Sequence, residues 1–196
     1  MLQWPIIAVI AGAAIVLGVN KMRPRTVLAI GDSLTANGGY CKALENRLPK
    51  GSSVFCVGYP GAGVKAIRKA VNVADQKGAT DIIILAGVND LASGRDAQDI
   101  ADQLELLYKE ARATGARVIA VNLTPWAGHF IGKKKIAETI KLNILIHTSS
   151  IPSYRINTSA LGKGGVLKDE YDSGDGLHLN SAGQTELANI IYRQVF

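Results

Sequence analysis

The sequence is poor in the residues that build metal sites and disulfide frameworks, with two cysteines and three histidines in 196 residues. Two cysteines cannot form a disulfide framework or a zinc ribbon, and the His-Glu-x-x-His spacing of zinc enzymes is missing. Glycine-rich phosphate loops are missing as well. Charged residues make up only 19% of the chain and apolar residues 47%, which excludes intrinsic disorder. We therefore expect one folded domain with a full apolar core.

Basic runs interleaved with aromatic residues are also absent, although the formal net charge is +6. Three of the 22 basic residues, Lys21, Arg23 and Arg25, follow one another near the N-terminus, and without them the net charge falls from +6 to +3. The folded part is only mildly positive, so nucleic acid is not a predicted partner.

The one long apolar run lies at the N-terminus, where residues 1–20 carry no charged side chain and 15 of the 20 are apolar. As a helix, residues 2–19 would be about 27 Å long, close to the hydrocarbon thickness of a bilayer. Trp4 suits the membrane interface, and Pro5 suits a first helical turn. We predict a single-pass anchor with a basic collar over residues 1–25, followed by one domain over residues 26–196.

Two other interpretations of this run remain open. A cleaved signal peptide would need positive charge before the run and small residues at a cleavage site, and Leu17-Gly18-Val19 is a poor site. A buried core helix would not need to be uncharged on every face. The positive charge after the run favours a cytoplasmic domain, although a single short span can insert either way.

The remaining chain alternates between strand and helix patterns. Five short runs predict strands buried on both faces: Thr26–Ile30, Ser53–Val57, Asp81–Ala86, Arg117–Asn122 and Tyr154–Asn157. Apolar residues at helical spacing predict three long helices, over Ala97–Thr114, over Lys133–His147 (marked by Ile136, Ile140 and Ile144) and after Ser181. Ser181 and Gln184 have capping-box spacing, and Gly162–Gly176 is predicted to be a mobile loop. The alternation predicts an α/β fold with a parallel sheet and a ligand site at its carboxyl edge.

Residues that could take part in catalysis follow the first three predicted strands. Ser33 follows the first strand, where its hydroxyl is either exposed at the sheet edge or caps the next helix. Gly61, after the second strand, offers a backbone N–H or simply permits a tight turn. Asn89, after the third, either donates to developing negative charge or completes a turn.

A carboxylate and an imidazole, Asp175 and His178, stand close together near the C-terminus. A carboxylate can orient an imidazole so that its other nitrogen acts as a base. With Ser33, Gly61 and Asn89, these residues complete the set of groups that acyl transfer from an ester requires. The Gly-x-Ser-x-Gly elbow of ordinary α/β-hydrolases is absent.

The order of these blocks resembles that of the SGNH hydrolase superfamily, the GDSL esterases and lipases. Four blocks match in order: Gly31–Leu34 (GDSL), the glycines around Gly61, Gly87–Asp90 (GVND) and Asp175–His178 (DGLH). The resemblance covers about Thr26–Phe196. It implies a flavodoxin-like three-layer α/β/α sandwich with a five-stranded parallel sheet, and it implies no metal and no organic cofactor.

The resemblance also implies residue roles. Ser33 would be the nucleophile, His178 the general base and then acid, and Asp175 the residue that orients His178. The backbone N–H groups of Ser33 and Gly61 and the Asn89 side chain would form the oxyanion hole. The asparagine often found upstream in the glycine block is missing, so Gly63 is an alternative to Gly61. Two other histidines match no block, and we interpret His147 as structural and His129 as part of a pocket rim.

These features predict a membrane-anchored serine esterase that acts on a small-acyl or acetyl ester of a lipid or a cell-envelope carbohydrate. Alternatives are a long-chain lipase or lysophospholipase, a thioesterase, a non-catalytic SGNH-like binding protein and a structural membrane protein of a larger assembly. Trp126–Phe130 and Ser159–Gly174 are the predicted pocket walls. The sequence predicts no oligomeric state.

Cys41 and Cys56 fall on the first predicted helix and the second predicted strand, which could be neighbours. Buried free thiols are the commoner state for such a pair. A disulfide would indicate an oxidising compartment.

Overall fold

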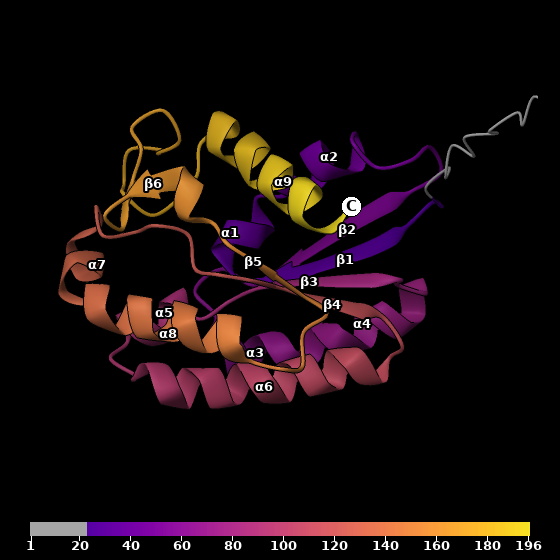
Figure 1. The fold of residues 1–196 in the computed structure, drawn as a ribbon, viewed down its shortest axis with the longest axis horizontal. Helices are drawn as coiled ribbons and strands as arrows, with labels where there is room; N and C mark the ends of the chain where they lie inside the picture. The colour runs from indigo at the N-terminus through magenta and orange to yellow at the C-terminus, as the bar shows by residue number, and fades with distance from the viewer. Residues whose placement is uncertain (1–22) are drawn as a thin grey trace, which may run out of the picture.

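Five parallel strands form the centre of the fold in a computed structural model, which describes residues 23–196 (Figure 1). The strands are β1 (Thr26–Gly31), β2 (Ser53–Gly58), β3 (Asp81–Leu85), β4 (Arg117–Val121) and β5 (Tyr154–Ile156). Their order across the sheet is β2-β1-β3-β4-β5, the flavodoxin-like order. The predicted parallel sheet and its strands are therefore confirmed, with boundaries that differ by one residue.

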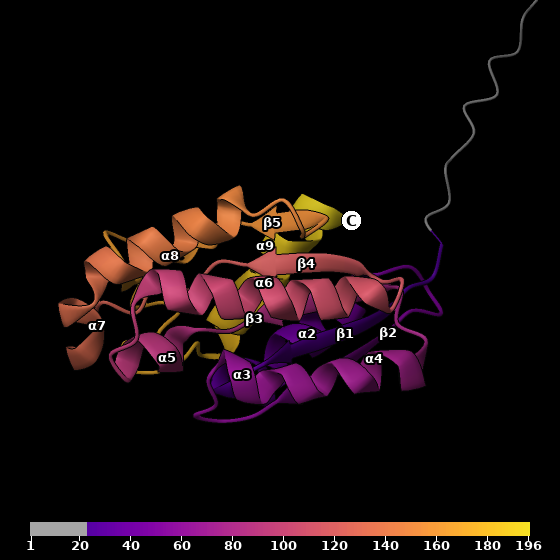
Figure 2. The same ribbon diagram turned by 90° about the horizontal axis from the view of Figure 1, so that it is seen from below.

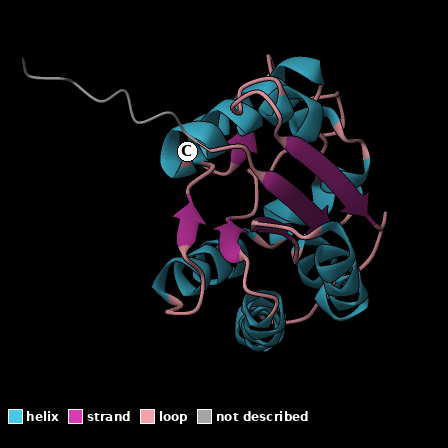
Figure 3. Cartoon of the chain, turned by 90° about the vertical axis from the view of Figure 1, so that its right-hand side faces the viewer, coloured by secondary structure: helices cyan, strands magenta, loops and turns pink. Residues whose placement is uncertain are grey.

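Helices cover both faces of this sheet (Figure 3). On one face lie α1 (Ser33–Ala36), α2 (Gly39–Glu45) and α9 (Ser181–Val195). On the other lie α3 (Val64–Ile67), α4 (Val71–Lys77), α5 (Val88–Ala92), α6 (Ala97–Ala113) and α8 (Ile136–Thr148), with α7 (Phe130–Lys134) before α8 (Figure 2). Two 3₁₀ turns, Arg68–Ala70 and Ser159–Leu161, complete the helical elements of residues 23–196.

The core follows from the strand sequences. Every residue of β3, including Ile82, Ile83 and Ile84, is buried because helices pack on both of its faces. The helices add apolar faces to this core, as Leu104 and Leu107 do from α6.

One local prediction was wrong. The cap of α9 is Asn180, whose side chain accepts from Gly183 N–H, and not a Ser181–Gln184 capping box. Gln184 is buried and instead accepts the backbone N–H of Tyr40 at 2.9 Å. The predicted loop Gly162–Gly176 begins with a small antiparallel hairpin, β6 (Gly162–Lys163) with β7 (Val166–Leu167).

The apolar positions that marked α8 do not face the core. Ile136, Ile140 and Ile144 are exposed, and the helix packs into the core through Leu142 and Ile146 instead. The predicted helix is present as α8, but it starts three residues later and ends one residue later than predicted.

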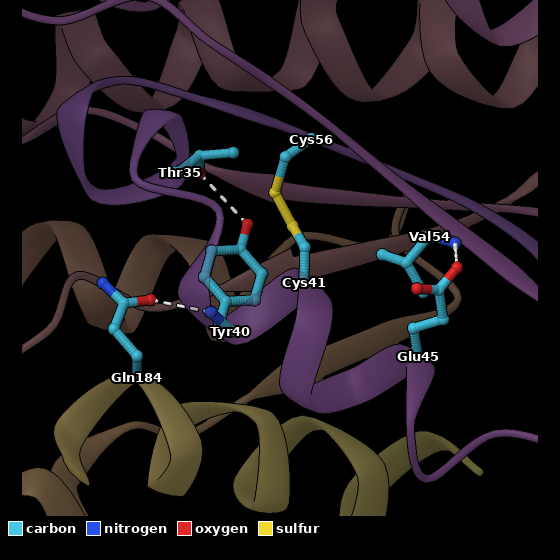
Figure 4. Close-up of a disulfide and its surroundings, with 7 residues drawn as sticks. All are labelled: Thr35, Tyr40, Cys41, Glu45, Val54, Cys56 and Gln184. Carbon is cyan, nitrogen blue, oxygen red and sulfur yellow. Dashed lines mark hydrogen bonds between the residues drawn. A yellow bond between two sulfur atoms is a disulfide. The ribbon is translucent and has the colours of Figure 1, made fainter. Parts of the chain in front are cut away.

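Cys41 on α2 and Cys56 on β2 form a disulfide, so the expectation of free thiols was wrong (Figure 4). The bond ties α2 to the edge strand of the sheet. Next to it, the hydroxyl of Tyr40 lies 3.0 Å from that of Thr35 on α1, and Val54 N–H donates to Glu45 at 3.2 Å. These contacts join α2 to α1 and to β2.

The transmembrane anchor predicted for residues 2–19 lies outside the described residues. Within residues 23–196, no helix combines the length and the apolar character required to cross a bilayer.

Candidate active site

The five residues predicted from the sequence lie at the carboxyl edge of the sheet, on the left in Figure 1. Ser33 begins α1 directly after β1, Gly61 lies in the turn after β2, and Asn89 lies on α5 after β3. Asp175 and His178 lie in the loop before α9. Since β1 lies between β2 and β3, the three segments end side by side, at the switch point where α/β sheets bind ligands.

The hydroxyl of Ser33 contacts an imidazole that is 145 residues away in the sequence. Ser33 Oγ lies 2.9 Å from His178 Nε2. The capping interpretation of Ser33 was wrong, because Asp32 caps α1 and accepts Leu34 N–H at 3.0 Å. The serine hydroxyl is therefore available to the histidine.

The other imidazole nitrogen of His178 contacts Asp175, with 2.6 Å between Nδ1 and Oδ2. The second carboxylate oxygen accepts the backbone N–H groups of Leu177 at 2.9 Å and His178 at 2.8 Å. Partial burial raises the pKa of Asp175, but the hydrogen bonds from the His178 side chain and from these two N–H groups outweigh it, and the pKa lies well below its usual range. Asp175 is thus a carboxylate at neutral pH.

The turn that carries Asp175 is held by a residue that the sequence analysis did not single out. Asp172 accepts the N–H groups of Gly174 at 2.9 Å and Gly176 at 3.0 Å. Gly176 has φ +75°, and an added Cβ would lie 2.5 Å from the backbone of Gly128 and His129. Only glycine fits there, and its close approach seats the turn against the segment after β4.

Asn89 is held beside the turn that contains Gly61. Its Nδ2 donates to the carbonyl oxygen of Ala62 at 3.1 Å, which leaves its second amide hydrogen unused. Gly61 is exposed and has φ +74°. Among the hydrogen bonds of residues 23–196, none uses the backbone N–H of Ser33 or Gly61. The N–H groups of Ser33 and Gly61 and one amide hydrogen of Asn89 are thus hydrogen-bond donors without a partner among the described residues.

Asp90 is a second residue whose position only the structure reveals. Its buried carboxylate accepts Val64 N–H at 2.8 Å and Arg95 Nη1 at 3.1 Å. It thereby ties the turn after β2 to α5. The alternative glycine, Gly63, packs directly against this carboxylate. The Asn-Asp pair in the third block was the available sequence signal, but it also fits an ordinary turn.

Asp32 is completely buried beside Ser33, and one of its carboxylate oxygens has no hydrogen-bond partner among the described residues. Burial raises the pKa of Asp32 to about 6, against the opposing effects of the Leu34 N–H bond and the nearby His178. A carboxyl that titrates near neutral pH therefore lies one residue from the serine.

A cavity of about 310 Å³ lies on the same side of the sheet edge, beyond β4 and β5. Neither Ser33 nor His178 lines it. Parts of both predicted walls do, including Trp126 and Ser159. His129 caps α7 by accepting Ile131 N–H at 3.3 Å, and it is not among the residues that line this cavity. No cluster of residues suited to a metal ion occurs in the part of the chain that the structure describes.

Comparison with known families identifies the family of the chain. The GDSL-like Lipase/Acylhydrolase family matches residues 29–185, which contain the first three blocks and the Asp175–His178 block. The chain belongs to this family. It is accordingly a serine ester hydrolase, and the predicted family is confirmed. The comparison with curated proteins finds no match.

Solved structures of GDSL enzymes and esterases share the fold. A GDSL-like lipase from Bacteroides thetaiotaomicron is 17% identical, with a TM-score of 0.67 and 86% of each chain covered. The acetyl xylan esterase AlAXEase is 16% identical, with a TM-score of 0.70, 87% of this chain and 100% of that chain covered. A third structure is that of the psychrotrophic esterase EstA from Pseudoalteromonas sp., inhibited by monoethylphosphonate. It is 19% identical, with a TM-score of 0.63, and the match covers 87% of this chain and 96% of that chain.

Proposed function

We propose that this GDSL-family hydrolase cleaves carboxylic esters through an acyl-enzyme on Ser33. The observation that carries the proposal is the continuous chain of contacts from Ser33 Oγ through His178 to Asp175, at 2.9 Å and 2.6 Å. A serine, a base within hydrogen-bond reach and a third group that orients the base are the requirements of nucleophilic catalysis.

The reaction has two halves. Ser33 Oγ attacks the ester carbonyl carbon while His178 Nε2 takes the hydroxyl proton. His178 then gives this proton to the alcohol oxygen as the carbon–oxygen bond of the ester breaks. A water molecule attacks the acyl-enzyme in the same way and returns the proton to Ser33. Asp175, as a carboxylate, accepts Nδ1–H and stabilises the imidazolium that forms in each half.

The negative charge on the carbonyl oxygen needs donors that are already in place. We assign this role to the N–H groups of Ser33 and Gly61 and to the free amide hydrogen of Asn89. The bond from Asn89 to Ala62 supports the assignment, because it holds the amide beside the Gly61 turn. A preorganised donor of this kind lowers the activation barrier by about 3 kcal/mol.

A small-acyl or acetyl ester on a larger carrier is the proposed substrate. The catalytic side chains lie at the surface, where Asp175 is 46% exposed and His178 30% exposed. Such an open site accepts an ester that protrudes from a polymer or a membrane. The fold shared with the acetyl xylan esterase AlAXEase supports an acetylated carbohydrate in particular.

We further propose that residues 2–19 tether the enzyme to a membrane, on the strength of their uncharged apolar sequence. The Cys41–Cys56 disulfide supports an oxidising compartment for the domain. The positive charge after residue 20 favours the cytoplasmic side instead. We give more weight to the disulfide, and labelling of an introduced surface cysteine in intact cells with a membrane-impermeant reagent decides between the two sides.

Turnover by the full-length enzyme in detergent tests the catalytic proposal. Ser33→Ala is expected to abolish hydrolysis of p-nitrophenyl acetate and labelling by a fluorophosphonate, with an unchanged circular dichroism spectrum. Ser150→Ala, which removes an exposed serine outside the site, should retain both. Turnover by the Ser33 variant would exclude the acyl-enzyme. A preference for p-nitrophenyl decanoate over the acetate would indicate a long-chain lipase.

A further inference from the structure

The helix α8 lies at the edge of its layer (Figure 2). It carries large apolar side chains that are exposed to solvent. Ile136, Ile140 and Ile144, one turn apart, are 39%, 56% and 57% exposed, and Phe130 on α7 is 69% exposed. We call these four residues the apolar stripe. They do not stabilise the fold by burial, since other residues attach α8 to the core. An aligned set of exposed residues of this size is typical of an interaction surface.

Positive charge borders the apolar stripe. Lys133, Lys134 and Lys135 lie between Phe130 and Ile136, and none of the three is within 4.0 Å of a carboxylate oxygen in residues 23–196. Lys134 Nζ lies 4.3 Å above the Phe130 ring, so the cation and the exposed ring share one surface.

The segment that carries these lysines contains little negative charge. The only acidic residue between Phe130 and Thr148 is Glu138. Its carboxylate accepts Ala97 N–H at 2.8 Å, which directs it toward the start of α6. The surface is therefore both apolar and positive.

The stripe also forms one side of the cavity beyond β4 and β5. Ile136 and Ile140 line the cavity of about 310 Å³, together with Gly164 and Gly165 of the β6–β7 hairpin. A shallower hollow continues along Ile140 and Ile144 toward the end of α8. Apolar groups can therefore enter beside the helix as well as lie on it.

We propose that the apolar stripe and the three lysines dock onto an anionic lipid bilayer. Isoleucine and phenylalanine side chains enter the acyl boundary, while lysines bind acidic headgroups. A second copy of this chain fits less well, because the lysines of the two copies would face and repel one another. Residues 1–20 contain no acidic side chain that could pair with the lysines. The inference goes beyond the esterase assignment, and its test does not depend on ester hydrolysis.

Fluorescence quenching on the full chain, reconstituted in vesicles, tests this docking. The chain has only two cysteines, which form the disulfide, so an introduced cysteine is the only free thiol. Ile144→Cys, labelled with a polarity-sensitive dye, is compared with Ala182→Cys at an exposed position of α9 on the opposite layer. The vesicles contain phosphatidylcholine with or without phosphatidylglycerol, and a quencher is attached to the acyl chains.

We expect the dye at position 144 to be quenched at least about twofold more than that at position 182 in vesicles with phosphatidylglycerol. Replacing Lys133, Lys134 and Lys135 by glutamine should lower the docking equilibrium constant roughly 10²-fold. The matched control replaces three exposed lysines of the α3–α4 segment, Lys65, Lys69 and Lys77, and should have no effect.

Equal quenching at positions 144 and 182 would overturn the proposal. So would quenching at position 144 that is unchanged by the glutamine substitutions, because the surface would then not respond to lipid charge. Dye self-quenching that grows with protein density in vesicles without the quencher would assign the surface to a second copy of the chain. Circular dichroism establishes that each variant is folded.

Discussion

Asn89 Nδ2 donates to the carbonyl oxygen of Ala62 at 3.1 Å, so a side chain that follows β3 is bound to the turn that follows β2. The bond uses one amide hydrogen and leaves the other free. Because the turn is also held by Asp90 through Val64 N–H, both proposed oxyanion donors from these segments have fixed positions before any substrate arrives. Donors that need no reorganisation are the ones that lower a barrier most.

Asn89→Ala should therefore lower kcat for p-nitrophenyl acetate by about 10²- to 10³-fold, with little change in KM. The lost donor acts on charge that exists only in the transition state. Steady-state kinetics measure the effect, and Asn72→Ala, at an exposed position of α4, is the matched control. An unchanged kcat would remove Asn89 from the oxyanion hole.

Asp175→Asn should lower kcat by about 10⁴-fold, because an amide in place of the carboxylate stabilises the wrong imidazole tautomer and no longer stabilises the imidazolium. Ser33 and His178 would keep their positions, so fluorophosphonate labelling should slow in parallel with turnover. Asp169→Asn, outside the site, serves as control. A loss of less than tenfold would mean that Asp175 does not orient the base.

Asp32→Asn should stabilise the protein at alkaline pH. The pKa of Asp32 in the folded state, about 6, lies above the value of an unfolded aspartate, so the folded state binds this proton more tightly. Stability is accordingly lost as the pH rises from about 4 to above 6. Asparagine stays neutral and can still accept Leu34 N–H.

The expected gain in the free energy of unfolding is up to about 3 kcal/mol at pH 8 and close to zero at pH 4, measured by urea denaturation. A gain of the same size at both pH values would show that the buried charge is not its cause.

Removing the disulfide with Cys41→Ala and Cys56→Ala should lower the free energy of unfolding by about 3 kcal/mol, since the bond closes a loop with a sequence separation of 15. Reduction of the wild-type protein should have a similar effect and should leave the double variant unchanged. Equal stability of the oxidised wild type and the double variant would refute the structural role of the bond.

The candidate catalytic residues were accessible from the sequence because strand ends in a parallel sheet share one edge. Ser33, Asn89 and His178 each stand beyond a predicted strand or just before a helix, where reacting groups are exposed. Asp172 and Asp90 were not accessible in this way, since their function is to accept N–H groups whose positions depend on the folded turns.

The sequence by itself determined the parallel α/β fold, its five strands and the family, because burial on both faces and the four short blocks are local patterns. Only the tertiary structure decided that Cys41 and Cys56 are bonded, that Gln184 holds Tyr40 and that Ile140 faces solvent. Helical spacing shows that a helix has an apolar side. Which side packs into the core depends on neighbours that are distant in the sequence, and so does the pairing of two thiols.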